Sequence, residues 1–254
     1  SAFSLQRSTG FNSLKWIPES TAFFLRVGFD NPDVLGIDLS VYLKEKDEEL
    51  YGKKDSVNNL IGKDLNGFFD LLGKEAILCE METVGNENAK RVALFHPSNI
   101  NDLVLFTEEL NKAAESFQPF KVQPFSVLNR TVQKLEIEEF PALLFGSSFS
   151  GFPECYFTTW QGYLIIANSQ KAMESYLAEV SIGKTWANSS RHTELRTQLN
   201  KNAQITAVIS PQRIWNNIYF SLPTDWQKSV LKHENRFKNM RLMAIGKHRI
   251  SSLT

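Results

Sequence analysis

The sequence predicts an α+β protein in which antiparallel sheets carry helices packed on one face. The clearest stretch, Cys155–Val180, has the order strand, tight turn, strand and helix, with a glycine at the turn, where a positive φ is tolerated. The same order occurs earlier, in Glu75–Phe117. We therefore expect two related ββα units, one in the half 17–125 and one in the half 126–254.

Composition limits the classes of protein to consider. With 254 residues, of which 42% are hydrophobic and 22% charged, the chain has ordinary globular usage and can form one large domain or two smaller ones. The 28 basic and 28 acidic residues cancel, which argues against nucleic acid as the main partner. No apolar run approaches the roughly 20 residues of a membrane span, so we expect no transmembrane segment in this sequence.

In the first half, aromatic and alternating apolar residues mark the strands. We expect strands at Thr21–Phe29, Glu75–Thr83 and Lys90–His96. After the first strand, Asn31-Pro32-Asp33 is a good helix start, although the apolar residues behind it alternate as in a strand, and we favour the helix. The mixed charges of Lys44–Asp55 indicate a solvated loop or a helix end.

Two more helices complete this half. A short one at Asp64–Leu72 presents an apolar face and is closed by Gly73. The other begins after Ser98 or Asn99, either of which can cap it. Its apolar residues are spaced as one stripe: Leu103, Phe106, Leu110, Ala113 and Phe117.

The second half has a similar mixture of elements. Strand is expected within Ser126–Ile137, and a short apolar stretch, Pro141–Phe145, follows it. Ser169 caps a helix that runs to Val180, and Thr224 with Gln227 has the form of a capping box. The remaining elements are strands at Cys155–Trp160, Tyr163–Ala167, Ala203–Ser210 and Met240–Gly246, and helices at Ser190–Leu199, Arg213–Phe220 and Thr224–Phe237.

Two short motifs resemble catalytic loops but lack the neighbours that such loops need. Gly183-Lys184-Thr185 matches the end of a phosphate-binding loop, yet Ala178 stands where the first glycine belongs, and a helix precedes it instead of a strand. We interpret Gly183 as the end of that helix. Ser148 lies in Gly146–Gly151, but Ser150 occupies the place of the second glycine of a hydrolase elbow.

Metal and disulfide chemistry have little support in the residue spacing. Four scattered histidines form no i, i+4 pair: His96, His192, His233 and His248. Cys79 and Cys155 form no CxxC motif, and we expect buried free thiols. If the two ββα units bring their first strands together, the thiols approach each other, and a Cα separation above about 7 Å would exclude a disulfide.

One pair of carboxylates is placed as acid–base catalysis requires. Glu80 and Glu82 are two residues apart on a predicted strand and point the same way, although a solvated strand face is the simpler interpretation. We therefore predict no catalytic, cofactor-binding or metal-binding residues.

The strongest local charge bias lies in Lys228–Arg249, which has seven Lys or Arg and one acidic residue, Glu234. Nucleic-acid-binding proteins combine such a patch with clustered aromatic residues, and here only Phe237 lies inside it. Attraction to a polyanion or to lipid headgroups is one interpretation, and a solvated helix face is the other. Asn129-Arg130-Thr131 and Asn188-Ser189-Ser190 have the form of glycosylation sequons.

Several short motifs recur in an order that points to a known family. Gly73 and Glu75 precede a strand, an Ala-Asn-Ser sequence precedes the helix that starts near Ser169, and Gly-Lys-Thr follows that helix. From about Ile17 to Leu242 the chain thereby resembles a group of bacterial envelope proteins that is catalogued only as a domain of unknown function. The stretches that carry the resemblance are Phe68–Thr83, Lys90–Leu110, Phe140–Leu177, Gly183–Leu199 and Ile205–Ser210.

The resemblance implies export to the periplasm or cell surface, an anchor or signal peptide outside this sequence, and a longer parent protein. It offers no active site to carry over. We therefore expect a non-enzymatic extracytoplasmic module that binds or scaffolds an envelope protein or polymer. One alternative is a hydrolase that gathers carboxylates from distant positions, and another is polyanion or lipid-headgroup binding through Lys228–Arg249.

Overall fold

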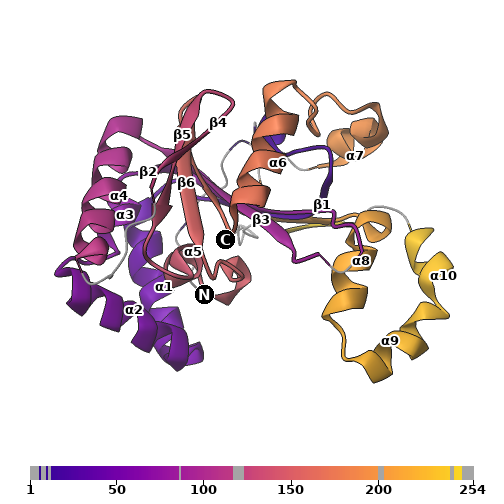
Figure 1. Ribbon diagram of the computed structural model, residues 1–254, viewed down its shortest axis with the longest axis horizontal. Coiled ribbons are helices and arrows are strands. Elements are labelled where there is room, and N and C mark those ends of the chain that lie inside the picture. The colour runs from indigo at the N-terminus through magenta and orange to yellow at the C-terminus, as the bar shows by residue number, and fades with distance from the viewer. Residues whose placement is uncertain are drawn as a thin grey trace, which may run out of the picture.

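One antiparallel sheet runs through the part of the chain that the computed structural model describes, residues 6, 10, 13–85, 87–116, 123–199, 203–240 and 243–247 (Figure 1). Within these residues nine strands lie in the order β4-β5-β6-β7-β3-β2-β1-β8-β9, and each neighbouring pair is antiparallel. The predicted α+β class is confirmed. Strands from the halves 17–125 and 126–254 share this one sheet.

The strands are short to medium in length. Their ranges are β1 (Thr21–Gly28), β2 (Leu72–Met81), β3 (Lys90–Pro97), β4 (Phe125–Val127), β5 (Arg130–Leu135), β6 (Cys155–Trp160), β7 (Tyr163–Ala167), β8 (Ile205–Ile209) and β9 (Met243–Lys247).

Helices flank the sheet along most of its width. The α-helices are α1 (Pro32–Lys46), α2 (Glu48–Ile61), α3 (Gly67–Asp70), α4 (Ile100–Glu115), α5 (Phe140–Phe145), α6 (Gln170–Ser181), α7 (Thr193–Gln198), α8 (Pro211–Ser221), α9 (Thr224–Leu231) and α10 (Glu234–Lys238). Short 3-10 helices are η1 (Ser13–Trp16), η2 (Ser147–Phe149) and η3 (Ser190–His192).

Helix α1 forms in a stretch whose sequence has both a helix start signal and the alternating apolar residues of a strand. The Asn31 side chain caps it and accepts a hydrogen bond from the Val34 N–H (3.4 Å). Of the alternating apolar residues, Leu35 and Leu39 are buried whereas Ile37 is exposed, because only every third or fourth residue of a helix faces the core. The predicted helix is confirmed.

Next to it, the charged stretch Lys44–Asp55 contains a helix end, one of its two interpretations, because α1 ends at Lys46. It is not a loop, since α2 begins at once and is capped by the Asp47 side chain, which accepts from the Leu50 N–H (3.2 Å). One further expectation is corrected. The predicted helix Asp64–Leu72 shrinks to the single turn of α3, and Gly73 lies inside β2 instead of closing a helix.

Two expectations in the second half are also wrong in detail. The strand predicted within Ser126–Ile137 is a hairpin, β4–β5, whose turn residues Leu128 and Asn129 have φ values of 49° and 61°. Positive φ at both central positions is the geometry of a two-residue hairpin turn. The helix predicted from Thr224 divides into α9 and α10, and the Thr224 side chain makes no cap because Pro223 occupies the cap position.

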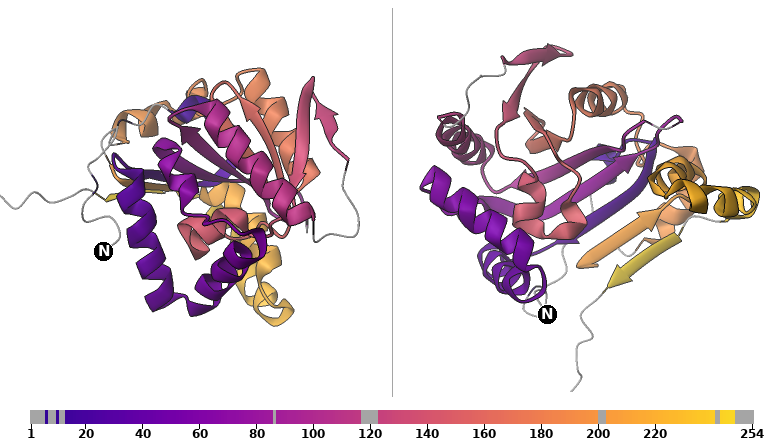
Figure 2. Two further views of the ribbon diagram at one scale, coloured as in Figure 1. Left: turned by 90° about the vertical axis from the view of Figure 1, so that its left-hand side faces the viewer. Right: turned by 60° about the horizontal axis from the view of Figure 1, so that its bottom comes forward.

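Each face of the sheet carries its own apolar core. Along β7 the residues alternate between them, so Leu164 and Ile166 face one core while Ile165 and Ala167 face the other. Helices α1, α4 and α5 contribute buried residues to the first core, and α6 contributes to the second. Figure 2 shows helices on both sides of the sheet, so the expectation of helices on one face is wrong.

The order strand, strand, helix occurs twice, as β2–β3–α4 and as β6–β7–α6, and β3 pairs with β7 at the centre of the sheet. The two helices nevertheless lie on opposite faces. A two-fold axis that relates two antiparallel strands leaves equivalent helices on the same face, so the predicted duplication is not shown by the arrangement.

The two cysteines are separated in the same way. Cys79 on β2 faces the second core and Cys155 on β6 faces the first, and β3 and β7 lie between their strands, about 14 Å in all. Both thiols are buried and free. A disulfide between them is therefore excluded, as the prediction allowed.

Candidate functional site

The Gly183-Lys184-Thr185 motif belongs to the loop that follows α6. Gly183 has a φ of 71° and its N–H donates to the Val180 carbonyl (3.1 Å), so it ends the helix as predicted. The Lys184 ammonium pairs with Glu179 (3.2 Å), and Thr185 is buried in a bridge to Pro18. All three residues of the motif thus make contacts that hold this loop and the end of α6 in place.

Ser148 and the histidines lie apart from one another. Ser148 is exposed in η2, and none of the described histidines is hydrogen-bonded to it. His192 stacks on Trp186 with 3.8 Å between ring centroids, and burial lowers its pKa to about 4. His96 packs edge-on against Tyr163, whereas Phe117, His248 and the basic residues Arg241 and Arg249 lie outside the described residues.

In the residues that the structure describes, no group of three or more His, Cys, Asp or Glu side chains is placed to hold a metal ion. Every helix in that part of the chain is also too short or too polar to span a bilayer.

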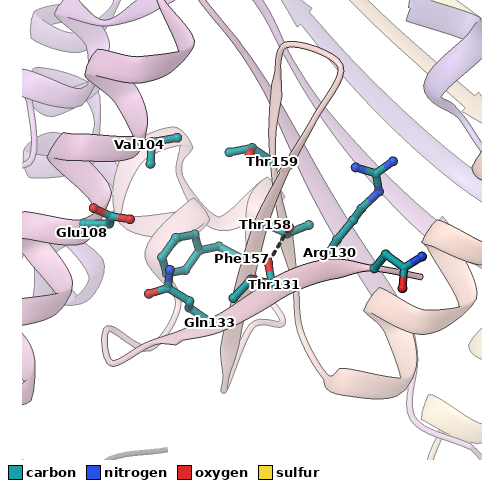
Figure 3. A pocket seen from close by; sticks show the side chains of 9 residues that line it. Val104, Glu108, Arg130, Thr131, Gln133, Phe157, Thr158 and Thr159 are labelled. Atoms are coloured by element: carbon teal, nitrogen blue, oxygen red, sulfur yellow. Dashed lines mark hydrogen bonds between the residues drawn. The ribbon is translucent and has the colours of Figure 1, made fainter. Parts of the chain in front are cut away.

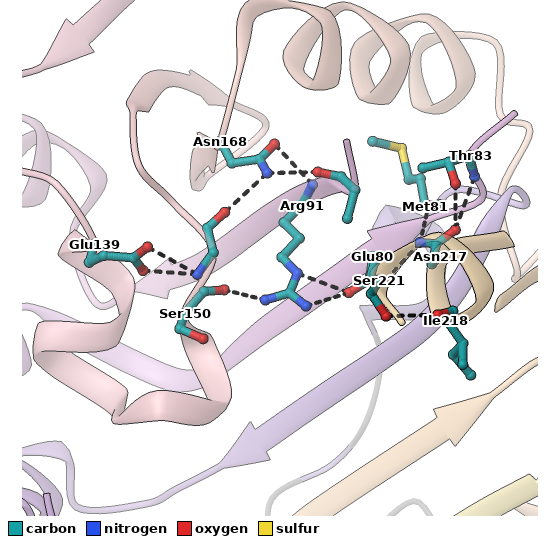
Figure 4. Close-up of polar contacts among 12 residues, drawn as sticks. Glu80, Met81, Thr83, Arg91, Glu139, Ser150, Asn168, Asn217, Ile218 and Ser221 are labelled. Atoms are coloured by element: carbon teal, nitrogen blue, oxygen red, sulfur yellow. Dashed lines mark hydrogen bonds and ion pairs between the residues drawn. The ribbon is translucent and has the colours of Figure 1, made fainter. Parts of the chain in front are cut away.

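Glu80 and Glu82 do not form a pair. Strand β2 ends at Met81, so Glu82 lies beyond it and is exposed, whereas Glu80 is buried. The Glu80 carboxylate accepts hydrogen bonds from Arg91 Nε (2.9 Å) and from Asn217 Nδ2 on α8 (2.7 Å) (Figure 4). Glu80 therefore joins a helix to the sheet.

This polar network extends on both sides of Glu80 (Figure 4). Thr83 Oγ1 donates to Asn217 Oδ1 (2.7 Å), and Asn216 Nδ2 donates to the Thr83 carbonyl (3.0 Å). On the other side, Arg91 Nη1 donates to the Ser150 carbonyl (2.6 Å). Because these bonds link β2 and β3 to α8, they hold the start of the C-terminal helices firmly against the sheet.

A second buried ion pair lies on the second-core face. Arg26 is 0% exposed, and its Nε lies 2.7 Å from Glu75 Oε2. Glu75 Oε1 accepts from the Tyr163 hydroxyl (2.9 Å) and from Ser13 Oγ. Burial and the Glu75 carboxylate raise the pKa of Tyr163. The cluster is enclosed by η1 and the sheet, so we interpret it as structural.

The C-terminal arm, Pro211–Met240, projects from the end of the sheet (Figure 1). Helix α8 is its base, with Ile214 and Trp215 buried, and α10 packs on that base through Phe237, whose ring lies 5.5 Å from the Trp215 ring. Helices α9 and α10 contain no buried residue. A helix that buries nothing in its own chain leaves its apolar face free for a partner.

Apolar and basic side chains share the exposed surface of the arm. Trp226 is 65% exposed and Leu231 is 48% exposed. Lys228, Lys232 and Arg236 are exposed as well, and no acidic side chain among the described residues pairs with them. The predicted basic patch is thus present in its described part and is combined with a large exposed aromatic residue.

A groove of about 560 Å³, the acidic groove, lies between α2, α4 and α5. Lys53 is the basic residue of its rim, and Leu60, 48% exposed, lies at its open side. Its floor is apolar and its rim carries three carboxylates. The floor residues are Val57, Ile61, Ala114, Ile137 and Leu143, and the carboxylates are those of Glu136, Glu138 and Glu139.

A smaller pocket of about 260 Å³ lies between α4 and strands β5 and β6 (Figure 3). Glu108 reaches towards it from the helix, and Gln133, Phe157 and Thr159 reach towards it from the strands. Arg130 points away and lies over the Trp160 ring instead, at 4.5 Å from its centroid. The lining suits a small polar molecule, since it offers a carboxylate, an amide and a hydroxyl.

No family model, curated protein or solved structure matches the chain. The arm and the two cavities are therefore described by their own chemistry.

Sequence reasoning found the charge of the arm but missed its exposure and the acidic groove. The acidic run Glu136–Glu139 was a signal in the sequence for the groove rim. The floor could not be found in this way, because it combines residues from α2, α4 and α5 that are far apart along the chain.

Proposed function

We propose that this chain is a non-enzymatic binding and scaffolding module of the bacterial cell envelope, that it acts outside the cytoplasm, and that it forms part of a longer protein. The observation that supports binding is the C-terminal arm, whose helices α9 and α10 bury no residue within the described chain. An exposed tryptophan such as Trp226 is typical of interface anchors, in which aromatic side chains contribute much of the binding energy. The envelope location rests on the family resemblance.

The alternative of a hydrolase has less support. The two buried carboxylates on the sheet, Glu75 and Glu80, are bound to Arg26 and Arg91. The carboxylate oxygens of Glu75 accept hydrogen bonds from Arg26 and Tyr163, and those of Glu80 accept hydrogen bonds from Arg91 and Asn217. Ion-paired carboxylates therefore favour a structural role for both residues.

The proposal is tested in the full-length protein in the cells that produce it. A photo-reactive phenylalanine derivative replaces Trp226 on the arm, and the control carries it in place of Ile182, which is also exposed but lies at the end of α6. We expect specific adducts from the arm position and none from the control. Equal adduct yields from the two positions would contradict a docking role for the arm.

Location is tested with Ser229→Cys, an exposed position on α9. Because both native thiols are buried, a membrane-impermeant maleimide should label only the new one. We expect labelling in intact cells. Labelling that requires lysis of the cells would place the module inside the cytoplasm and end the proposed location.

A second candidate function is binding of the arm to an anionic surface. It is favoured by the exposed Trp226 and Lys228 on α9, with Lys232 at the C-terminal end of that helix, since basic amphipathic helices with tryptophan bind at membrane interfaces. Vesicles with and without phosphatidylglycerol, and a heparin column, distinguish lipid from polyanion. If replacing Lys228, Lys232 and Arg236 by Ala changes neither vesicle binding nor heparin retention, this candidate fails.

A further inference from the structure

We infer that the C-terminal arm of one copy of this chain docks into the acidic groove of a second copy, so that the protein associates with itself head to tail. The inference rests on the proposed docking role of the arm and names its partner. It follows from two exposed surfaces of the same chain that complement each other in apolarity and in charge.

The acidic groove can accept an apolar side chain. Its floor is formed entirely by aliphatic side chains, and Leu60 is 48% exposed at its open side. A volume of about 560 Å³ lies within the range of roughly 300–1,000 Å³ in which protein pockets enclose their ligands. An exposed tryptophan such as Trp226 is the kind of side chain that fills such a pocket when two proteins associate.

The rim of the groove is negative. Its basic residue, Lys53, is bound to Glu49 (2.8 Å), which lies on the same helix. Glu139 accepts from the backbone N–H groups of Gly151 (2.9 Å) and Phe152 (3.0 Å), which fix the place of its carboxylate. Glu136 pairs with Lys134 (3.1 Å), so the surplus of negative charge that the rim presents to an approaching partner comes from Glu138 and Glu139.

The arm carries the opposite charge. Lys228 and Lys232 flank the exposed Leu231 closely in sequence, and Arg236 follows on α10. Complementary charge around an apolar contact selects the orientation of a partner and accelerates the encounter. Among the occupants that the arm chemistry allows, a second copy is favoured because only it also fills the acidic groove.

The arm cannot fill the groove of its own chain. The arm and the helix pair α1–α2 lie at opposite ends of the longest axis of the molecule in Figure 1, and the right-hand view of Figure 2 agrees. The contact must therefore join different copies through two different surfaces. Such heterologous contacts continue from copy to copy and form either a ring or an open chain.

Sedimentation velocity of the 254-residue chain tests the inference. We expect the weight-average mass to rise above the 29.0 kDa of one copy as concentration increases, and to fall again at high salt, which screens the charged rims. Trp226→Ser on the arm and Leu60→Glu in the groove should each weaken association by about tenfold or more. Ile182→Glu, an equally polar change at an exposed site away from both surfaces, should have no effect.

Mixing the two defective variants is the sharpest test. A Trp226→Ser copy keeps its groove and a Leu60→Glu copy keeps its arm, so an equimolar mixture should form a heterodimer that stops at two chains. A symmetric interface made of two arms or two grooves would give no such rescue. Circular dichroism and thermal unfolding of each variant establish that it is folded, which is expected because both side chains are exposed.

The outcomes separate this inference from the proposed function. A wild-type chain that stays at the mass of one copy, or a mixture that shows no heterodimer, overturns self-association. Cross-linking of the arm to a different protein or to lipid would then leave the docking role of the arm intact. If position 226 gives no specific cross-link, both self-association and the docking role of the arm are contradicted.

Discussion

Replacing Glu75 by Gln should expose how much the buried Arg26–Glu75 pair contributes to stability. Gln preserves the shape of the side chain and can still accept a hydrogen bond from the Tyr163 hydroxyl, but it has no negative charge. Arg26 is 0% exposed, so its guanidinium would stay buried after losing the carboxylate that lies 2.7 Å away. The change therefore isolates the electrostatic part of the pair.

The expected loss in the free energy of unfolding is about 3–5 kcal/mol, the cost of removing one partner of a buried ion pair. Whole domains are stable by only about 5–15 kcal/mol, so the variant should be close to unfolding at physiological temperature. The matched control is Glu109→Gln, which breaks the exposed Lys63–Glu109 pair and should cost less than about 1 kcal/mol.

Urea unfolding followed by tryptophan fluorescence measures both variants, and Trp16 lies next to Tyr163 as a local reporter (5.4 Å between ring centroids). If Glu75→Gln costs no more than the control, the assignment of a buried, stabilising pair is refuted. A double variant, Arg26→Met with Glu75→Leu, should be more stable than Glu75→Gln, because it leaves no buried charge unpaired. The double variant should still be less stable than the wild-type protein, since the Ala203 carbonyl loses its guanidinium donor.

Two more results are expected. Burial lowers the pKa of His192 to about 4 from the usual value of about 6.5, so the unfolded chain binds a proton before the folded chain does as the pH falls. The free energy of unfolding should therefore decline between about pH 6.5 and pH 4, by at most about 3 kcal/mol. His192→Phe, which keeps a ring against Trp186, should lack this decline, and identical pH profiles of the two proteins would contradict the assignment. Burial raises the pKa of the Cys79 and Cys155 thiols, so a thiol reagent should label neither of them in the native protein and both after unfolding. Rapid labelling of the native protein would show that one of the thiols is accessible.

Some elements could be predicted from the sequence because local pattern and tertiary packing agree in them. Strands β6 and β7 and helix α6 are examples: the turn has its glycine, Ser169 caps the helix, and the apolar stripe faces a core. Helix α1 was predicted from its cap alone, against a misleading alternation of apolar residues. In each case the deciding signal was a specific backbone or cap requirement.

Other elements could not be predicted, for reasons that the structure makes clear. The β4–β5 turn places Leu128 at positive φ, a conformation for which leucine gives no sequence signal. The face of the sheet on which a helix packs is set by connections that hydrophobic periodicity does not encode, which is why α4 and α6 were expected on one side. The acidic groove likewise depends on three helices meeting in space.

The position of β1 has a consequence for how the protein is made. This N-terminal strand lies between β2 and β8, so Phe24 is paired with Cys79 on one side and with Val208 on the other. A chain that leaves the ribosome from its N-terminus must keep one edge of β1 open until β8, Ile205–Ile209, has emerged. An open strand edge can pair with other chains, so this protein has to delay the closure of its sheet while avoiding aggregation.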